Sequence, residues 1–259
     1  MTGDREWRVV TGEFSPAMHM ALDEVITDRV AAGEVRPTLR FWEWKDPSVV
    51  IGRFQAVRDE VFEDMAAQHG IDVVRRCSGG GAMFCEPGTV ITYSLSLPEA
   101  SIATDDIVAS YRELEQWTLD ALQSVGAAAE WQPVNDIVNS GQKIGGSAQA
   151  RWDGTVLHHT MLAYDLDLEK MLQVLKIGEE KISDKAIESA AKRVSPLSEQ
   201  VDLPREEIVD AMVTRFAQHQ SVRNGSITEE EVAAAQDLVR EKYGTDEWLY
   251  RVDREIEGF

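Results

Sequence analysis

The sequence has little cysteine and no long apolar run. Its 259 residues include two cysteines, Cys77 and Cys85, which are too few for a disulfide framework and lack zinc-site spacing. No segment approaches the run of about 18 apolar residues that a membrane span needs. The first residues carry neither an apolar stretch nor a basic lead-in, so we expect no signal peptide. These absences predict a cytoplasmic protein in a reducing compartment, without a membrane partner.

Positive charge is also scarce. The chain has 46 acidic and 26 basic residues and a formal net charge of -20, with eight lysines against 18 arginines. This balance disfavours non-specific binding to nucleic acid, so we expect no nucleic-acid partner. Two interpretations of the acidity stay open: adaptation to strong salt, as in a halophile, or an ordinary acidic cytosolic enzyme.

The pattern of apolar residues places strands in the middle of the chain and helices at both ends. Several strands follow one another without an intervening helix, which disfavours a doubly wound parallel sheet. We therefore predict an α+β fold, with a mixed or antiparallel sheet flanked by helices, in a single domain over residues 1–259. Expected helices cover residues 16–33, 57–70, 105–126, 166–176, 204–220 and a segment capped by Thr228 and Glu231; expected strands cover residues 38–44, 47–52, 71–76, 89–97, 128–131, 135–138, 142–151 and 155–164.

A glycine-rich stretch, RRCSGGGAMF (residues 75–84), lies between two of the predicted strands. A P-loop or a dinucleotide fingerprint would lead into a helix, and this stretch does not. Its backbone N–H groups could cradle an anion, with Arg75 and Arg76 adding bidentate contacts to phosphate or carboxylate. The plain alternative is a tight turn or bulge.

Two further motifs carry candidate chemistry. Lys143 begins the small-residue strand of residues 142–151, where partial enclosure would require an anionic partner; the alternative is a surface lysine at a strand end. His158 and His159 are neighbours in a strand, so they face opposite sides and at most one faces a given pocket. A core or hydrogen-bonding role is the alternative for each histidine.

Taken in order, the motifs resemble the lipoate–protein ligase A family, within the biotin and lipoate protein ligase superfamily. The resemblance runs over nearly the whole chain and corresponds to that family's catalytic domain alone. Its motifs are MHMALDE, VVIGRFQ (residues 49–55), RRCSGGGAMF, NDI followed by KIGGSAQ, LHHTMLAYDLDL, SDKAIESAAKRVSPL (residues 183–197) and DEWLY.

The resemblance implies a fold similar to the catalytic core of biotin protein ligases and class II aminoacyl-tRNA synthetases. It implies that ATP, with Mg²⁺, converts lipoic acid to lipoyl-adenylate, and that a lysine of a lipoyl domain then takes the lipoyl group. The acceptors would be lipoyl domains of 2-oxoacid dehydrogenase E2 subunits or the glycine-cleavage H protein. No protein nucleophile is needed, because positioning and charge stabilisation do the work.

The resemblance also assigns residues. Lys143 would be catalytic and bridge the lipoate carboxylate and the α-phosphate. Asp136 would either orient Lys143 or coordinate Mg²⁺, and these two roles stay open. The residues that would bind ATP and the adenylate are Arg76, Gly81, Ala82, Met83, Phe84, Asp136 and Lys143. The residues that would bind lipoate are Arg75, Ser78, Gly79, Gly80, Gly81, Lys143, Gly146, Ser147 and His159. An adenylate-binding loop would contribute Lys181, Lys185 and Arg193, and the alternative for these three is a solvated basic patch.

Some features depart from the family pattern. Cys85 stands where the family commonly has a histidine, and Thr160 where it commonly has a glycine. We expect no C-terminal accessory domain. A separate accessory ligase subunit is therefore a candidate partner for adenylation, and transfer from preformed lipoyl-adenylate by this chain alone stays open.

Two alternative functions remain. One is an octanoyl- or lipoyl-transferase that acts without ATP through a cysteine thioester, although no cysteine follows residues 157–164, where related transferases place theirs. The other is a lipoate-binding subunit that is inactive without its partner. A biotin ligase is disfavoured because that family's GRGRxGR-type loop is absent.

Overall fold

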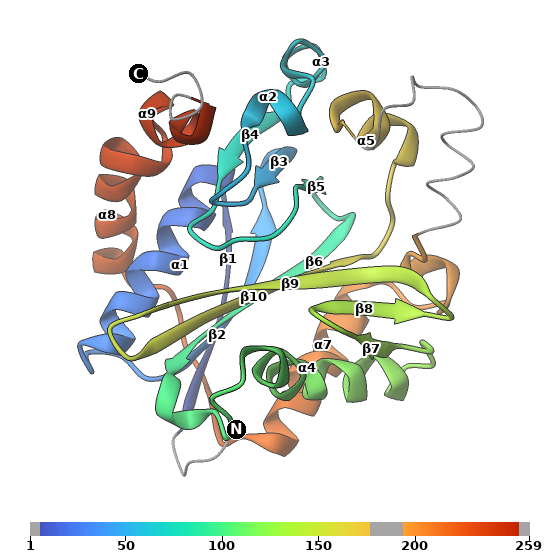
Figure 1. Cartoon of the computed structure of the whole chain (residues 1–259). Helices are drawn as coiled ribbons and strands as arrows, with labels where there is room; N and C mark the ends of the chain where they lie inside the picture. The colour runs from blue at the N-terminus through green and yellow to red at the C-terminus, as the bar shows by residue number, and fades with distance from the viewer. Residues whose placement is uncertain (1–5, 177–193, 254–259) are drawn as a thin grey trace.

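The computed structural model describes residues 6–176 and 194–253, which form two β-sheets with helices packed around them (Figure 1). The larger sheet has eight strands in the order β11-β1-β2-β6-β10-β9-β8-β7. β1 runs parallel to β11 and to β2, and every other pair in this sheet is antiparallel. The strands are β1 (Trp7–Phe14), β2 (Thr38–Trp44), β6 (Val90–Pro98), β7 (Glu130–Gln132), β8 (Asp136–Asn139), β9 (Gln142–Trp152), β10 (Thr155–Ala163) and β11 (Val222–Asn224).

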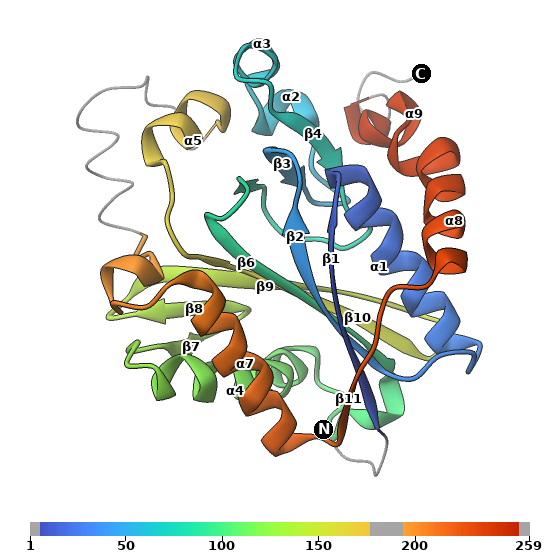
Figure 2. The ribbon, with the colours of Figure 1, turned by 180° about the vertical axis from the view of Figure 1, so that it is seen from behind.

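Helices cover both faces of this sheet. α1 and α8 lie on one face, and α4 and α7 pack against each other on the opposite face (Figures 1 and 2). The alternation of β6 explains the two layers: Tyr93 and Leu95 join the core with α4 and α7, while Ser94 and Ser96 bond groups on the α1 side. The helices are α1 (Pro16–Ala31), α4 (Ile107–Ser124), α7 (Arg205–His219) and α8 (Glu229–Leu238).

Local sequence signals account for several helix starts. Pro16 occupies the first turn of α1, the Asp106 side chain caps α4, and Thr228 and Glu231 form the predicted capping box of α8. None of the described helices combines the length and apolarity needed to cross a membrane. The predicted α+β fold, a mixed sheet flanked by helices, is confirmed.

A second, three-stranded sheet in the order β4-β3-β5 lies beside the large one and carries a core of its own. The motif RRCSGGGAMF joins its strands β4 and β5, and we name residues 76–82 the glycine loop. The remaining elements are β3 (Ser48–Ile51), β4 (Asp72–Arg75), β5 (Met83–Cys85), α2 (Val57–Glu60), α3 (Glu63–Gln68), α5 (Leu168–Val174), α9 (Asp246–Leu249), the 3-10 turns η1 (Glu99–Ser101) and η2 (Leu197–Glu199), and the π-helical turn η3 (Val239–Tyr243).

The structure corrects one predicted helix and adds detail that the sequence did not give. The strands on either side of the Asp46–Pro47 turn belong to different sheets, because β3 pairs with β4 and β5. The helix predicted over residues 57–70 is two short helices, α2 and α3, since Val61 adopts an extended conformation that interrupts it. Ile107, the first residue of α4, is 58 % exposed.

Candidate active site

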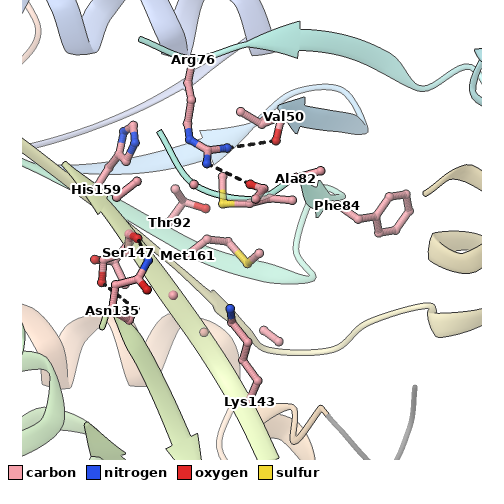
Figure 3. Close-up of a pocket in the computed structure, with 18 of the residues that line it drawn as sticks. Val50, Arg76, Ala82, Phe84, Thr92, Asn135, Lys143, Ser147, His159 and Met161 are labelled. Atoms are coloured by element: carbon pink, nitrogen blue, oxygen red, sulfur yellow. Dashed lines mark hydrogen bonds between the residues drawn. The ribbon is translucent and has the colours of Figure 1, made fainter. Parts of the chain in front are cut away.

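A cavity of about 250 Å³, here named the main cavity, lies between the glycine loop and the large sheet. Arg76 enters it from the glycine loop, and Lys143 enters it from β9 on the opposite side (Figure 3). Most of the remaining wall is apolar, which suits an acyl chain. The lining residues are Met20, Trp42, Val50, Arg76, Gly80, Gly81, Ala82, Met83, Phe84, Thr92, Asn135, Lys143, Ile144, Gly145, Gly146, Ser147, Ala148, His159, Thr160, Met161, Ala163, Leu166, Met171, Leu175 and Val194.

Arg76 holds the glycine loop from inside. Its Nη1 donates to the carbonyl oxygen of Val50 at 3.1 Å, and its Nη2 donates to those of Gly79 and Gly81 at 2.6 and 2.9 Å. Its Nε donates to Ser78 Oγ at 3.1 Å. These bonds fix the loop against β3, so the shape of the main cavity depends on one side chain.

The charge of Arg76 is buried beside the cavity. The residue is 3 % exposed, and its recorded partners within the described part of the chain are all uncharged. Burial lowers the pKa of Arg76 to about 10, which leaves the guanidinium protonated at neutral pH. A buried cation without a carboxylate partner favours an anionic group on a ligand in the same cavity.

Glycine is required at Gly80 of this loop and at Gly52, which faces the loop from the end of β3. Gly80 has a φ of +91°, a left-handed conformation that other residues rarely adopt. A Cβ at Gly52, just after β3, would lie 2.1 Å from the carbonyl oxygen of Gly80, so the two backbones can touch only because Gly52 has no side chain. The glycine run therefore allows a close backbone contact as well as a wall for a ligand.

Arg75 does not line the main cavity. Its guanidinium is fully buried and donates to the backbone carbonyls of Gly52, Gln55 and Leu249, among others. Adjacent strand residues face opposite sides, so Arg75 ties α9 to β4 while Arg76 turns toward the cavity. The geometry gives Arg75 a structural role in place of the lipoate contact expected from the sequence.

Lys143 lies at the solvent side of the main cavity. Its Nζ forms an ion pair with Asp136 Oδ1 at 2.7 Å, and the two side chains are 53 % and 31 % exposed. A Cβ at Gly146 would lie 3.1 Å from this Nζ and 3.2 Å from Asp136 Oδ1, so glycine at that position leaves room for the pair. This ion pair is the geometry that an orienting role of Asp136 needs, and the alternative role in Mg²⁺ coordination stays open.

Asn135 and Ser147 join β9 to the turn before β8. The Asn135 side chain donates to the Ser147 carbonyl at 2.6 Å, and the Ser147 N–H donates to the Asn135 carbonyl at 3.0 Å. These bonds hold the strand segment that carries Lys143. Both residues line the main cavity, where the Asn135 side chain appears beside Ser147 in Figure 3.

The two adjacent histidines of β10 face opposite sides of the sheet, as predicted. His158 points toward α4, where its Nε2 lies 2.7 Å from Oε1 of the fully buried Glu115. Thr160 and Ser147 also donate to this carboxylate. Burial alone would raise the pKa of Glu115, but the neighbouring His158 and the hydroxyl donors lower it. A buried carboxylate therefore lies under the floor of the main cavity.

His159 points toward α1 and lines the main cavity. Its Nδ1 lies 2.9 Å from Asp23 Oδ2, and its Nε2 lies 2.5 Å from Ser78 Oγ. Arg40 donates to Asp23 Oδ1 at 2.5 Å. Burial would raise the pKa of Asp23, but Arg40 and His159 lower it, whereas burial lowers the pKa of His159. The carboxylate is thus anionic and the imidazole neutral at neutral pH.

Both cysteines are buried, and burial raises the pKa of Cys77 and of Cys85 to about 12. A thiol with so high a pKa holds almost no thiolate at neutral pH, and the thiolate is the reactive form. Neither cysteine is therefore suited to nucleophilic catalysis.

The sequence-predicted site residues fall into four groups. Arg76, Gly80, Gly81, Ala82, Met83, Phe84, Lys143, Gly146, Ser147 and His159 line the main cavity. Ser78 and Gly79 line an adjoining cavity, here named the side cavity. Arg75 and Asp136 lie outside both linings, and Lys181, Lys185 and Arg193 lie outside the described residues.

Sequence reasoning missed four residues that shape the site. Asp23 and Met20 belong to the quoted motif MHMALDE, and Asn135 begins the quoted NDI, so these motifs could have signalled them. Glu115 had no such signal, because a carboxylate on a helix is ordinarily solvent-exposed. Among residues 6–176 and 194–253, no group of three or more His, Cys, Asp or Glu side chains gathers as a metal site.

Comparison with known proteins identifies the family. The model of the lipoyl protein ligase A/B catalytic domain matches residues 15–217. This chain belongs to that family. The predicted family resemblance is thereby confirmed, and it places the chain among the enzymes that attach or transfer lipoyl-type acyl groups.

Curated relatives in this family carry two kinds of name. Lipoate-protein ligase A subunit 1 of Thermoplasma acidophilum is 32 % identical, over 89 % of this chain and 90 % of the relative. Octanoyltransferase LipM of Brevibacillus brevis is 29 % identical, over 95 % of this chain and 99 % of the relative.

Solved structures give the same picture. The bi-partite lipoate protein ligase of T. acidophilum, studied with its E2 lipoyl domain, aligns with a TM-score of 0.86 and 31 % identity, covering 96 % of this chain and 97 % of that one. A lipoate-protein ligase A bound with ATP has a TM-score of 0.82 and 30 % identity, covering 95 % and 99 %. A T. acidophilum protein with bound lipoic acid has a TM-score of 0.80 and 29 % identity, with the same coverage.

Proposed function

We propose that this protein is a lipoate–protein ligase that activates lipoate with ATP and transfers the lipoyl group to a lysine of a lipoyl domain. The observation that carries the proposal is the pair of cations at the main cavity. Arg76 is buried with only uncharged partners among the described residues, and half-exposed Lys143 is held by Asp136. Two cations around an apolar cavity suit a fatty carboxylate and a phosphate better than a neutral ligand. Similar structures bound with ATP and with lipoic acid support both substrates.

The first half-reaction joins two anions, so its activation barrier depends mainly on how well the site stabilises their negative charge. A lipoate carboxylate oxygen attacks the α-phosphorus of ATP, forming the mixed anhydride, and pyrophosphate leaves. The Lys143 ammonium has three N–H donors and uses one on Asp136, which leaves two for the carboxylate and the α-phosphate. Arg76 adds a fixed positive field from the glycine loop. Mg²⁺ would supply further charge neutralisation when bound with the nucleotide, and Asp136 is the residue that would hold it in the second of its two open roles.

The second half-reaction transfers the acyl group. The neutral amine of the acceptor lysine attacks the anhydride carbonyl, a C–N bond forms, and AMP leaves. Backbone N–H groups of the glycine loop and Lys143 are the donors available for the developing oxyanion. We propose a lipoyl domain, of an E2 subunit or an H protein, as the acceptor, and a separate accessory subunit for adenylation, because the similar T. acidophilum ligase is bi-partite and was studied with an E2 lipoyl domain.

A second candidate is octanoyl transfer without ATP, favoured by relatives named octanoyltransferase that align over nearly their whole length. A cysteine thioester is a poor intermediate for it here, because Cys77 and Cys85 are buried with pKa values raised to about 12. Any such activity needs another nucleophile or direct transfer.

The two candidates separate in one acyl-transfer assay on a lipoyl domain. Purified chain receives either lipoate with ATP, or octanoyl-CoA without ATP, and the modified lysine is measured by mass spectrometry. We expect lipoate with ATP to modify the acceptor, with the candidate accessory subunit present. Modification by octanoyl-CoA alone, with none from lipoate and ATP, would replace the first candidate by the second.

A further inference from the structure

Ser78, His159 and Asp23 form a hydrogen-bonded chain with the geometry of a nucleophile, a base and an orienting acid. Ser78 Oγ lies 2.5 Å from His159 Nε2, and His159 Nδ1 lies 2.9 Å from Asp23 Oδ2. Asp23 is anionic, so His159 donates its Nδ1–H to Asp23 and its unprotonated Nε2 accepts the Ser78 proton. This is the protonation pattern that activates a serine hydroxyl.

We propose that Ser78 is an acyl-accepting nucleophile with which this protein takes a medium-chain acyl group from a thioester without ATP. The proposal rests on the second candidate function and supplies the nucleophile that the cysteines cannot. It is independent of the ATP-dependent reaction, which needs no covalent bond to the protein.

Ser78 is 1 % exposed, and its Oγ also accepts a hydrogen bond from Arg76 Nε at 3.1 Å, so a thioester would have to reach it through the side cavity that it lines. The glycine loop passes β9 near Gly80, where a Cβ would lie 3.8 Å from the Cβ of Ala148. Residues 80–84 line the main cavity, whereas Ser78 and Gly79 line the side cavity, which has a volume of about 370 Å³. Strand β9 continues along both, from Lys143 in the main cavity to Trp152 in the side cavity. A carbonyl carbon at Ser78 would place its acyl tail toward the apolar main cavity and its thiol leaving group toward the side cavity.

The loop also offers donors for an oxyanion. Arg76 donates hydrogen bonds to the carbonyl oxygens of Gly79 and Gly81. In a trans peptide the N–H points opposite to the C=O, so the N–H groups of Gly80 and Ala82 point away from Arg76. Within the described residues no acceptor is recorded for these two N–H groups. They are the candidate oxyanion donors.

The chemistry balances without a further reagent. Ser78 Oγ attacks the thioester carbonyl as its proton passes to His159 Nε2, the C–S bond breaks, and the thiolate takes that proton. The acceptor lysine amine then attacks the Ser78 ester, a C–N bond forms, and the C–O bond breaks. The amine proton returns through His159 to Ser78 Oγ. The net reaction converts a thioester and an amine into an amide and a thiol.

The test uses the whole chain with octanoyl-CoA, without ATP and without acceptor, followed by intact-protein mass spectrometry and peptide mapping. We expect one octanoyl group on Ser78 in the wild-type protein and in the double variant Cys77→Ser, Cys85→Ser. His159→Asn and Asp23→Asn should form the ester at least about 100-fold more slowly. Ser78→Cys should carry the group as a thioester that neutral hydroxylamine cleaves.

The wild-type protein alone can overturn the proposal, so a variant that fails to fold does not affect the outcome. An unmodified chain at saturating octanoyl-CoA would contradict it. So would an octanoyl group on Cys77, Cys85 or Lys143. Because the assay contains no ATP, its failure leaves ATP-dependent ligation standing, and a failure of ligation leaves this ester standing.

Discussion

The two cations of the main cavity, Arg76 and Lys143, occupy opposite environments. Arg76 is 3 % exposed and holds four uncharged oxygen acceptors, so its guanidinium is fixed before any ligand arrives. The Lys143 side chain is 53 % exposed and holds one carboxylate, so its ammonium can turn toward a ligand at little cost. Arg76 therefore fixes the shape of the cavity and contributes a constant positive field. In the proposed reaction, Lys143 would supply the positive charge that can move with the reacting groups.

The comparison predicts its largest effect at Lys143. Lys143→Ala should lower adenylate formation by about 1,000-fold, because the transition state loses its mobile positive charge, while stability changes little. Pyrophosphate release and a thermal melt measure the two effects. Lys170→Ala is the matched control, since Lys170 pairs with Glu86 at the same 2.7 Å but lies outside both cavities. Equal losses in the two variants would remove the special role of Lys143.

The next largest effect is expected at Arg76, the buried cation. Arg76→Lys keeps the charge but loses the planar fork that holds three carbonyls, so kcat/KM for adenylation should fall by about 100-fold, with reduced stability. Arg75→Lys is the matched control: it breaks similar buried bonds outside the main cavity, so it should reduce stability without a comparable loss of activity. A ligand contact by Arg75 would appear as a raised KM at temperatures where the variant is folded.

Acid should lower the stability of the folded chain through its buried histidines. Burial first, and then the nearby Arg40, lower the pKa of His19 from 6.5 to about 3, and burial also lowers the pKa of His159. The unfolded chain then binds more protons than the folded chain below pH 6.5, so stability falls as pH drops from 6.5 toward 3. At pH 5 His19 alone corresponds to about 2 kcal/mol, roughly a 30-fold change in the folding constant. Denaturant unfolding at pH 7.5 and pH 5 measures it.

A free energy of unfolding that is unchanged or higher at pH 5 would contradict this prediction.

The smallest effect concerns Asp136. Asp136→Asn keeps an acceptor for Lys143 but removes the charge, so adenylation should fall by about 10-fold through looser positioning of the lysine. A magnesium titration separates the two roles of Asp136. If Asp136 only orients Lys143, the Mg²⁺ concentration at half-maximal rate should not change. A large increase in that concentration would show that the carboxylate binds the metal.

The sequence predicted most of the strands and several helix starts, because periodicity and capping residues are local signals. The convergence of the glycine loop with Lys143 is a long-range property, and it was predicted only through the resemblance to a known family. The same signals could not separate Arg75 from Arg76: both precede the glycines, and only the pleat of β4 decides which one faces the cavity. Nor could they show that β2 and β3 enter different sheets, since strand pairing is a long-range property.

The hydrogen-bond networks of the buried side chains could not be predicted from the sequence either. Glu115 reaches His158 from a helix 43 positions away along the chain, and Asp23 reaches His159 across 136 positions. Such contacts depend on how α1 and α4 pack on the two faces of one sheet. What the sequence did contain was the alternation of His158 and His159, which correctly predicted that they face opposite sides.

The most direct test of the central claim is ATP–pyrophosphate exchange with lipoate, with octanoate and with biotin, in the presence and absence of a candidate accessory subunit. We predict lipoate-dependent exchange in the wild-type protein and the loss of this exchange in Lys143→Ala. Absence of lipoate-dependent exchange under both conditions, or full exchange by Lys143→Ala, would contradict it.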